Sequence, residues 1–430
     1  MKSFGGTLVC ASMAMASALL AAVAGTEPDS RTDEQGRAMI SVGMADGDMR
    51  GGDNRAIQAA VDYVAGLGGG TVMILPGRYI MRNALRLRDN VRVCGTPSAT
   101  TLALCNAATS PLAKDGDCNQ RELTLANPVG FQVGDGVAVS DRNWSGGFCV
   151  STATITAQTA ANVFRISTPL YLDYFVSKGA SARQTFPAIG GWGINNAVVE
   201  DLIIEGNSAM QTWLDGCRGG GIYFFECRDV LVRRCAVRDY NGDGISFQVS
   251  ERVVVEDCVV QDNRGYGLHP GSGSAAPVMR RNKSVGNGSC GMFVCWRVQR
   301  GIFDDNELCD NKGEGISIGH KDSDNVFRNN TITGNAKAGV LFRVEDVPQG
   351  ADRNIFEGNR ILDNGKDGAA RAGVVLTGCH SGLVFRGNTI GNTRRESGAG
   401  VGMFIGKQIR ELASEGNRFV EVGADVMREE

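Results

Sequence analysis

The sequence predicts an all-β fold, a single-stranded right-handed parallel β-helix with an N-terminal capping helix, and three observations support this prediction. First, Asn or Cys recurs at near-constant spacing, at Cys235, Cys258, Asn282, Asn306, Asn330, Asn359 and Asn388. Second, another Asn and then a Gly follow in the same order within most of these repeats. Third, apolar and polar residues alternate within each repeat, and no repeat holds a helix-length stretch of period 3.6.

Each repeat is one structural unit that stacks on its neighbours. In the strand after the recurring Gly, the first and third residues are apolar, as in Ile245 and Phe247 or Val340 and Phe342, so we expect them to face inward. Another apolar column stands three residues before the recurring Asn. Asn amides can bind turn backbone groups and the Asn of the next coil, so a structural role is predicted for these asparagines.

The N-terminal part is predicted to close the solenoid. Residues 54–65 form an amphipathic pattern typical of a helix, and a Gly turn, a strand and a Pro-Gly turn follow it. An open end of a β-helix exposes unpaired strand edges, so we expect this helix to cap it, with coils from about residue 70 to the C-terminus.

The region from residue 86 to 200 has looser periodicity. Strand-like runs stand at 91–94, 137–140 and 201–204, whereas 143–151 and 171–192 resemble loops that project from the coils. We therefore predict one β-helix domain over residues 25–430, with an irregular first half and regular coils from about 197.

The first 24 residues are typical of a secretory signal peptide. Lys2 is followed by an apolar, small-residue run, and Ala22-Val23-Ala24 matches a cleavage site. The competing interpretation is a membrane anchor, but the run is short and no later segment is long and apolar enough to span a bilayer. The prediction is a secreted or periplasmic protein without a membrane anchor.

Composition and cysteine usage limit the possible partners. The net charge of -3 and the pI of about 5.8 argue against nucleic acid as the main partner. Of the 13 cysteines only Cys10 lies in the predicted signal peptide, and no C-x-x-C pair suggests a zinc site. Cys235 and Cys258 occupy equivalent positions in adjacent repeats, where they could form a disulfide or two stacked thiols.

Two stretches carry a resemblance to a known group of proteins. The run "DNRAIQAAVDYVAGLGGGTVMILPGRYIM" and repeats such as "NNTITGNAKAGVLF" resemble the pectate-lyase-like β-helix superfamily. Its members include polysaccharide lyases, glycoside hydrolases, uronate epimerases and non-catalytic surface proteins. The resemblance implies a carbohydrate cleft along the outside of one sheet, but it does not select the reaction.

Aligning the repeats on their Gly predicts one face that carries chemically versatile residues. All three histidines of the chain fall at or just after the end of the same predicted strand. We expect one continuous outer cleft there. The residues in this phase are Glu226, Gln248, His269, Trp296, Arg297, His320, Lys321, Asp322, Arg343, Glu345, Asp346 and His380.

The cations on this face favour an acidic polysaccharide as partner, because guanidinium and ammonium groups bind carboxylates. Cations that neutralise a uronate carboxylate, beside an imidazole base, suit β-elimination, so the predicted enzyme is a polysaccharide lyase. The predicted catalytic residues are His269, Arg297, His320, Lys321, Arg343 and Glu345. The predicted substrate-binding residues are Gln248, Trp296, Asp322 and Glu226.

Three alternatives remain open at the level of sequence. A glycoside hydrolase would need two carboxyl groups, and no spacing selects a pair from the available residues. A uronate epimerase and a non-catalytic polysaccharide-binding surface protein are also compatible with the pattern. The carboxyl groups available to a hydrolase are Glu345, Asp346 and Asp322, with Asp243 and Glu314 as further options that we expect to be structural turn residues.

No cofactor is firmly implied by the sequence, and nothing indicates a nucleotide or redox group. Calcium is a possible ligand, because related lyases use it to bind uronate carboxylates. Asp322, Asp324, Glu345 and Asp346 could supply oxygen ligands, but no calcium-binding motif assigns a site.

Overall fold

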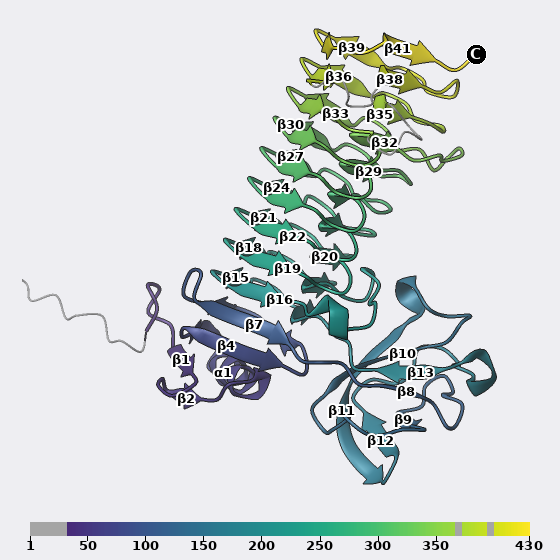
Figure 1. Cartoon of the computed structure of the whole chain (residues 1–430). Helices are drawn as coiled ribbons and strands as arrows, with labels where there is room; N and C mark the ends of the chain where they lie inside the picture. Colours follow the sequence, from purple (N-terminus) through teal and green to yellow (C-terminus); the bar gives the residue numbers. More distant parts are fainter. Residues whose placement is uncertain (1–31, 366–371, 394–399) are drawn as a thin grey trace, which may run out of the picture.

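The protein is a long solenoid of stacked coils that carries a smaller sheet near its N-terminal end (Figure 1). The structure, a computed structural model, describes residues 32–365, 372–393 and 400–430. The predicted signal peptide therefore lies outside the described residues. Three mainly parallel sheets form the solenoid, and from β15 to β41 each coil adds one strand to each sheet in turn.

Sheet 1 has 13 strands and runs the whole length of the solenoid. Its strands are β1 (Met39–Gly43), β2 (Met49–Arg50), β3 (Gly70–Ile74), β6 (Val91–Cys94), β15 (Val198–Glu200), β18 (Leu231–Arg233), β21 (Val254–Glu256), β24 (Val278–Arg280), β27 (Ile302–Asp304), β30 (Val326–Arg328), β33 (Ile355–Glu357), β36 (Val384–Arg386) and β39 (Ala413–Glu415).

Sheet 2 has 11 strands. They are β4 (Gly77–Met81), β7 (Thr100–Leu104), β16 (Ile203–Glu205), β19 (Ala236–Arg238), β22 (Val259–Gln261), β25 (Lys283–Val285), β28 (Glu307–Cys309), β31 (Thr331–Thr333), β34 (Arg360–Leu362), β37 (Thr389–Gly391) and β40 (Arg418–Val420).

Sheet 3, which also has 11 strands, carries the face on which the sequence places the site. They are β5 (Leu85–Arg86), β14 (Ile189–Trp192), β17 (Ile222–Phe225), β20 (Ile245–Gln248), β23 (Leu268–Pro270), β26 (Met292–Phe293), β29 (Ile316–Ile318), β32 (Val340–Phe342), β35 (Ala372–Leu376), β38 (Val401–Ile405) and β41 (Ala424–Arg428).

The core of the solenoid consists of apolar side chains stacked coil upon coil. Phe303 and Phe327 stack at 4.7 Å between ring centroids, Phe327 and Phe356 at 4.5 Å, and Phe356 and Phe385 at 4.8 Å. These separations match the spacing between neighbouring strands, so each ring continues the contact of the last. The predicted parallel β-helix and its inward apolar column are confirmed.

The recurring asparagines form a continuous buried ladder at the turns. The side-chain amide nitrogen of Asn306 donates to the side-chain oxygen of Asn330 at 3.0 Å and to the Met279 carbonyl at 2.9 Å. Its own side-chain oxygen accepts from the Asn282 amide group at 3.0 Å. Every polar atom of the ladder amide is thereby used inside the protein, which confirms the predicted structural role.

A helix precedes the first coil, as the sequence predicts. α1 (Asn54–Gly66) begins at the cap residue Asp53, whose carboxylate accepts from the Arg55 amide, and it buries Ile57, Val61 and Val64. Strands β1 and β2 come before this helix and extend sheet 1 beyond β3. The sequence analysis did not identify them, because they precede the first repeat.

A six-stranded, antiparallel sheet is inserted between β7 and β14 and has a core of its own, built on residues such as Leu123, Ile155 and Phe164. The expectation of irregular coils with projecting loops was wrong here. Antiparallel strands pair with sequence neighbours, so they carry no coil-to-coil period. The strands are β8 (Thr109–Pro111), β9 (Glu122–Thr124), β10 (Gly136–Ser140), β11 (Ser151–Ala160), β12 (Val163–Ile166) and β13 (Ser181–Arg183), and the short 3-10 helices nearby are η1 (Gly147–Cys149), η2 (Val176–Lys178) and η3 (Ser208–Met210).

All cysteines of the described residues are free thiols. Cys235 and Cys258 are both buried and free, and their thiols donate to the carbonyls of Arg233 and Glu256, so of the two arrangements left open they form stacked thiols. Burial raises the pKa of the Cys258 thiol well above its usual range.

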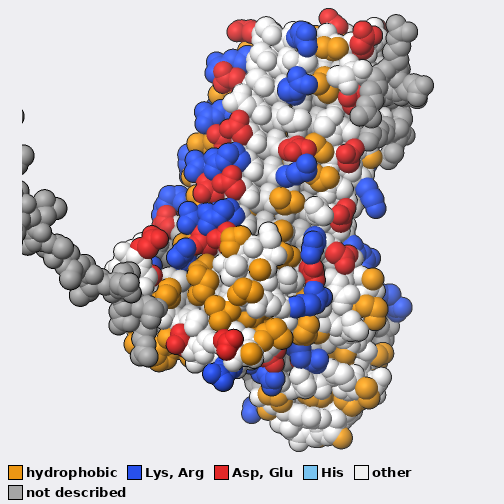
Figure 2. All heavy atoms as spheres, turned by 60° about the vertical axis from the view of Figure 1, so that its left-hand side comes forward, with side chains coloured by type: hydrophobic (Ala, Val, Ile, Leu, Met, Phe, Trp, Pro, Cys, Tyr) orange, Lys and Arg blue, Asp and Glu red, His pale blue; other side chains and the backbone are white. Residues whose placement is uncertain are grey.

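The outer surface is organised by ion pairs between consecutive coils. Figure 2 shows basic and acidic side chains alternating along the length of the solenoid. Such pairs include Arg252 with Asp229 at 2.6 Å and Arg353 with Asp324 at 2.6 Å. Many arginines of the coils are neutralised in this way.

Candidate functional site

A cavity of about 510 Å³ lies over the outer face of sheet 3, and we call it the roofed cavity. Strands β20, β23 and β26 and the turns that flank them form its floor. Residues 147–149 of the inserted sheet's connections and residues 213–217 between β16 and β17 close over it. The inserted sheet thus supplies part of a wall that coils alone do not provide.

A buried His–Asp pair lies in the floor of the roofed cavity. His269 Nδ1 is 2.7 Å from Asp243 Oδ2, and the other Asp243 oxygen accepts from the Tyr266 amide at 2.9 Å. The His269 ring makes edge contacts with Tyr266 and Phe293, both at 5.4 Å. Asp243, expected to be a structural turn residue, therefore has a partner with acid–base chemistry.

The protonation of this pair reflects burial and mutual attraction. Burial opposes a charge on His269, but the hydrogen bond with Asp243 and the negative charge of Asp243 outweigh it and raise the pKa of His269 to about 10. Burial also raises the pKa of Asp243, although His269 acts in the opposite direction. One proton is therefore held between the two side chains over a wide pH range.

The segment that covers this pair approaches it very closely. A Cβ atom at Gly216 would lie 1.8 Å from Asp243 Oδ2 and 2.6 Å from His269 Nδ1. The Gly216 carbonyl accepts from Ser246 Oγ at 2.7 Å and from Gln248 Nε2 at 3.3 Å. Gln248 is fully buried in this contact, beneath the segment that carries Gly216, and its role in substrate binding stays a prediction.

The turns after β26, β29 and β32 form a second, more exposed group, which we call the rim: Trp296, Arg297, His320, Lys321 and Glu345. Trp296 is 49% exposed, and its ring lies 4.8 Å from the His320 ring at 31°. His320 contacts the Glu345 carboxylate twice. Its backbone amide donates to Oε1 at 2.8 Å, and its ring Nδ1 lies 3.3 Å from Oε2. Because Trp296 also lines the roofed cavity, the two groups are continuous.

Two cations of the rim are available to a ligand. Arg297 is exposed and Lys321 is half-buried, and neither forms an ion pair within the described parts of the chain. Their backbone amides anchor the turns, from Arg297 to the His320 carbonyl at 2.9 Å and from Lys321 to the Gln349 carbonyl at 2.8 Å. The turns are therefore held in place while the charged ends of both side chains stay unneutralised.

Two further predicted residues are occupied by structural contacts. The Arg343 guanidinium donates to the Val294 carbonyl at 2.9 Å and to Asp322 at 3.2 Å, and it lies 4.6 Å from the Phe293 ring centre. Asp322 is fully buried and accepts from the Val298 and Gly319 amides, both at 2.9 Å. The catalytic role of Arg343 and the binding role of Asp322 stay predictions, and in this structure their polar atoms bind the protein itself.

Burial affects Asp322 strongly. It raises the pKa of this carboxyl to about 7, and the opposing charge of Arg343 only partly offsets it.

The two outermost predicted residues do not join the site. His380 is buried, with Nδ1 accepting from the Ala351 amide at 2.8 Å and Nε2 2.9 Å from the Arg343 carbonyl oxygen. Burial lowers the pKa of His380, as expected for a neutral structural imidazole. Glu226 is exposed in the turn after β17, and it does not line the roofed cavity.

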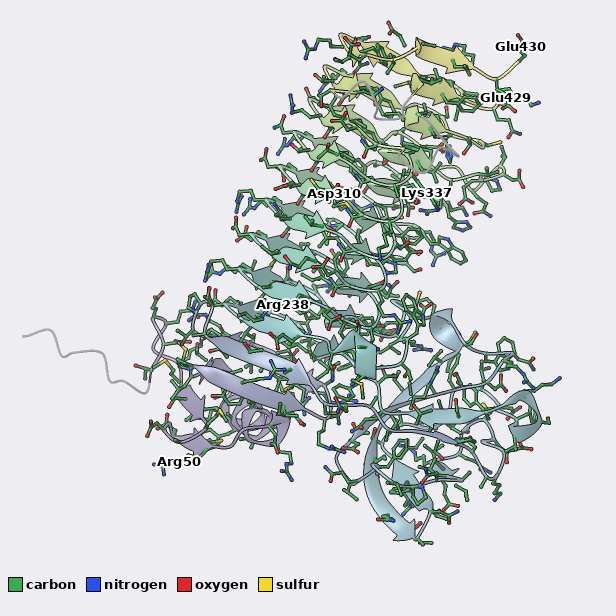
Figure 3. All side chains as sticks on the ribbon, viewed as in Figure 1. Arg50, Arg238, Asp310, Lys337, Glu429 and Glu430 are labelled. Carbon is green, nitrogen blue, oxygen red and sulfur yellow. The ribbon has the colours of Figure 1, made fainter. Side chains whose placement is uncertain are left out.

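Glu314 and Asp346 are two further carboxyl groups that a hydrolase could use. Glu314 accepts from the Cys290 thiol at 3.1 Å and lies 3.5 Å from the ammonium group of Lys337, which is labelled in Figure 3. The expectation of a structural role is in keeping with these contacts. Asp346 is exposed on the turn that carries Glu345.

Several residues of the roofed cavity were not predicted from the sequence, notably Cys217, Tyr266, Phe293 and Cys295. The repeat alignment contained a usable signal for two of them. Tyr266 precedes a recurring Gly and Phe293 stands in the outward position of β26, so both share the phase of the site. Cys217 lies in a connection without a repeat, and only the folded chain brings it to sheet 3.

Metal ligands do not converge in the described part of the chain. Within residues 32–365, 372–393 and 400–430, no group of three or more His, Cys, Asp or Glu side chains is placed to hold an ion. The four carboxylates considered for calcium are separated by their contacts, since Asp322 binds Arg343 and Asp324 binds Arg353. We assign no metal site to this geometry.

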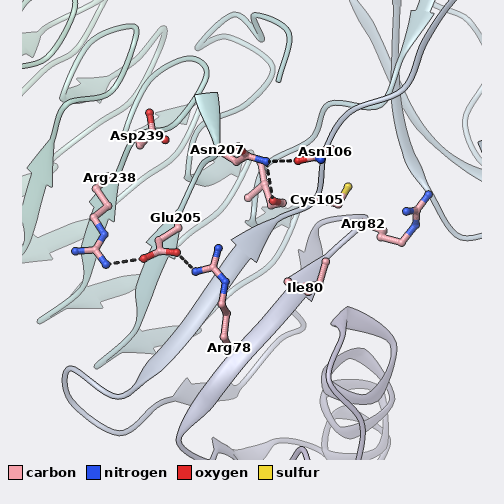
Figure 4. Close-up of a pocket in the computed structure, with 10 residues that line it drawn as sticks. Arg78, Ile80, Arg82, Cys105, Asn106, Glu205, Asn207, Arg238 and Asp239 are labelled. Atoms are coloured by element: carbon pink, nitrogen blue, oxygen red, sulfur yellow. Dashed lines mark hydrogen bonds and ion pairs between the residues drawn. The ribbon is translucent and has the colours of Figure 1, made fainter. Parts of the chain in front are cut away.

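A second hollow, of about 690 Å³, lies where β4 and β7 meet β16 and β19 (Figure 4). Its basic residues Arg78 and Arg238 both bind Glu205, the latter at 2.5 Å. Asn207 donates to Asn106 at 2.9 Å beside them. Because these charges are already paired, the hollow is a weaker candidate for binding an anion than the rim.

Comparisons with known proteins agree with the fold. A family profile described as "NosD: Periplasmic copper-binding protein (NosD)" matches residues 194–400. The chain is similar to the solved structure of Geobacillus virus E2 ORF18, with a TM-score of 0.52 and 12% identity over 90% of this chain and 62% of that one. It is also similar to the Dettilon tailspike protein gp208, with a TM-score of 0.51 and 14% identity over 87% of this chain and 58% of that one.

The described residues form a parallel β-helix. The fold that the resemblance implies is thereby confirmed. The chain is also similar to the solved A-module of Azotobacter vinelandii mannuronan C-5 epimerase AlgE6, with a TM-score of 0.48 and 17% identity over 88% of this chain and 96% of that one. No curated protein matches the sequence.

The matched family is described as copper-binding, which would require several metal-ligating side chains to converge. Cys217, His269 and Cys295 line one cavity, but they are not among any group of three potential ligands placed to hold an ion. The donor set of the described residues therefore does not fit a copper site.

Proposed function

We propose that this protein is an exported enzyme that cleaves an acidic, uronate-containing polysaccharide by β-elimination at the rim. The observation that carries the proposal is the His320–Glu345 pair, which stands between a half-exposed tryptophan and two unneutralised cations. Elsewhere on the solenoid, many arginines are paired with carboxylates of a neighbouring coil. The rim therefore offers positive charge to a ligand beside an aromatic ring and an imidazole.

Binding would use the shape and the charge of the rim. The flat Trp296 indole suits a sugar ring, because apolar ring faces pack against aromatic faces. The Arg297 guanidinium would bind the uronate carboxylate through two parallel hydrogen bonds. This contact withdraws electrons from the adjacent carbon and makes its proton easier to remove.

His320 is the base in this proposal. If its Nδ1–H donates to Glu345, its Nε2 holds the free lone pair and accepts the C5 proton of the uronate. The C5–H electrons form the C4–C5 double bond as the C4–O bond breaks, and the Lys321 ammonium donates a proton to the leaving oxygen. Solvent then returns the protons to their starting places.

Export is part of the same proposal. The N-terminal sequence is typical of a signal peptide, and the matched family is described as periplasmic. In the described residues, no helix is long and apolar enough to cross a membrane.

The test is a product analysis. Purified protein is incubated with uronate polymers and with a neutral polysaccharide, and ultraviolet absorbance and reducing ends are followed together. Elimination gives both signals, and only on the uronate polymers. Reducing ends without absorbance would establish hydrolysis, a change of uronate stereochemistry without cleavage would establish epimerisation, and binding without any product would establish a surface protein. Each of these three outcomes contradicts the proposal.

A further inference from the structure

Cys295 lies beside His269 in the wall of the roofed cavity. Its amide donates to the carbonyl of Pro270, the residue directly after His269, at 3.0 Å, so adjacent coils fix the two residues next to each other. The side chains line the same cavity, and the residues are 8% and 2% exposed.

The imidazole has one nitrogen free for this thiol. Nδ1 of His269 is occupied by Asp243, whereas Nε2 is buried and has no completed hydrogen bond within the described residues. An unpaired buried nitrogen is destabilising, so an imidazole that keeps one open is a distinctive feature of this fold. A thiol, an imidazole and a carboxylate in this order form the arrangement that activates a cysteine nucleophile.

We propose that Cys295, His269 and Asp243 form a second active centre, a thiol esterase that removes short O-acyl groups from the sugar units of the substrate. The cavity is lined by the rings of Phe148, Trp213, Tyr266 and Phe293, which suit a small apolar acyl group, and Trp296 connects it to the rim. The identity of the sugar rests on the proposed function, whereas the thiol chemistry does not.

The reaction balances with water as the only co-reactant. During attack, the proton shared by Cys295 and His269 lies on His269 Nε2, and the sulfur attacks the ester carbonyl carbon. The bond to the sugar oxygen breaks, this oxygen takes the proton from His269, and an acyl thioester remains on Cys295. Water then loses a proton to His269 and attacks the thioester, which releases the carboxylic acid and returns the proton to the sulfur.

The second thiol of the cavity lacks this arrangement. The Cys217 amide is held by the Asp215 carboxylate at 2.9 Å, and its carbonyl accepts from the Tyr223 hydroxyl at 2.7 Å. Burial raises the pKa of the Cys217 thiol far above its usual range, with the negative Asp215 acting in the same direction. Cys217 thus stays protonated, and the nucleophile is Cys295.

The proposal is tested with p-nitrophenyl acetate and the full chain in reducing buffer. We expect steady nitrophenolate release and, after acid quenching, an acetyl group on the peptide that contains Cys295. Cys295→Ser should lower the rate at least a hundredfold. Cys118→Ser removes an exposed thiol outside the cavity and should leave the rate unchanged. Acetylation of Cys118 in place of Cys295, or an unchanged rate in Cys295→Ser, would overturn the proposal.

Two further variants separate chemistry from folding. His269→Gln should abolish turnover, and Asp243→Asn, a change in a positioning residue, should move the pH profile of the rate and lower kcat more than it changes KM. Peptide mapping of the unmodified protein reports the acyl-enzyme even if these variants fold poorly. If the mapped peptide carries no acetyl group during turnover, the thiol mechanism is wrong.

The esterase activity and the lyase activity can be tested independently of each other. His320→Ala should lose elimination on an acetylated uronate polymer but keep the release of acetate. Cys295→Ser should lose acetate release from the same polymer. Loss of both activities in either variant would show one shared centre and would contradict a separate thiol site.

Discussion

Asp243 Oδ2 lies 2.7 Å from His269 Nδ1, although the two residues belong to consecutive coils and are separated by more than a full repeat. The Gly216 backbone covers this pair so closely that no side chain fits between them. A parallel β-helix thus turns a one-repeat spacing into a direct contact, and a connection outside the repeat seals it from water.

Gly216→Ala should damage the roofed cavity. The new Cβ would meet Asp243 Oδ2 at 1.8 Å, so the covering segment must move, and overpacking of this kind costs about 1–3 kcal/mol. We expect a lower melting temperature and loss of nitrophenyl acetate turnover. Gly66→Ala is the control, because its Cβ meets nothing within 4 Å at the end of α1. Equal effects of both changes would show that the cover is not tightly packed.

Arg297→Ala and Lys321→Ala should each lower elimination activity at least about a hundredfold, because each removes a charge that faces the developing negative charge of the transition state. Melting temperatures should stay close to that of the unchanged protein, since neither side chain forms an ion pair in the part of the chain that the structure covers. Arg360→Ala, an exposed cation on sheet 2, is the matched control and should keep full activity. Activity retained in Arg297→Ala and Lys321→Ala would remove the rim as the site.

Asp322 should make stability depend on pH in a defined direction. Burial raises the pKa of Asp322 in the folded protein to about 7, above the value of about 4 in an unfolded chain. The folded state then binds the proton more tightly, so this contribution to stability is full below about pH 4 and is lost as pH rises to about 7.

Melting temperatures across this pH range, compared between the unchanged protein and Asp322→Asn, measure the effect. The melting temperature of Asp322→Asn should rise relative to that of the unchanged protein as pH rises. Asp346→Asn, which alters an exposed carboxylate nearby, should run parallel to the unchanged protein. A pH-independent difference for Asp322→Asn would contradict the assignment.

Asn306→Ala should destabilise the solenoid by about 3 kcal/mol, because it leaves the Met279 carbonyl and the amide groups of the neighbouring ladder residues without partners. Chemical denaturation followed by circular dichroism would measure the loss. The exposed Asn195 offers a control whose change to Ala should alter the free energy of unfolding by less than about 0.5 kcal/mol. A cost at Asn306 no larger than that at Asn195 would mean that the ladder does not carry stability.

The repeat determined most of the fold from the sequence alone. In a stack of near-identical coils, a residue's position within the repeat fixes its sheet and its direction, so the buried Phe303 column and the Asn306 ladder follow from periodicity. The same reasoning placed Trp296, His320 and Glu345 on one face. No comparable rule exists for the inserted sheet, whose strands pair locally and interrupt the period.

Only the tertiary structure decided which residues of that face are free to act. Arg343 and His269 share a phase, yet one is tied to Asp322 and backbone while the other keeps an open buried nitrogen. Cys217 reaches the site through a connection that belongs to no repeat. Periodicity specifies the direction of a side chain, whereas its availability depends on hydrogen-bond partners and on segments folded over it, and these come from distant, aperiodic parts of the chain.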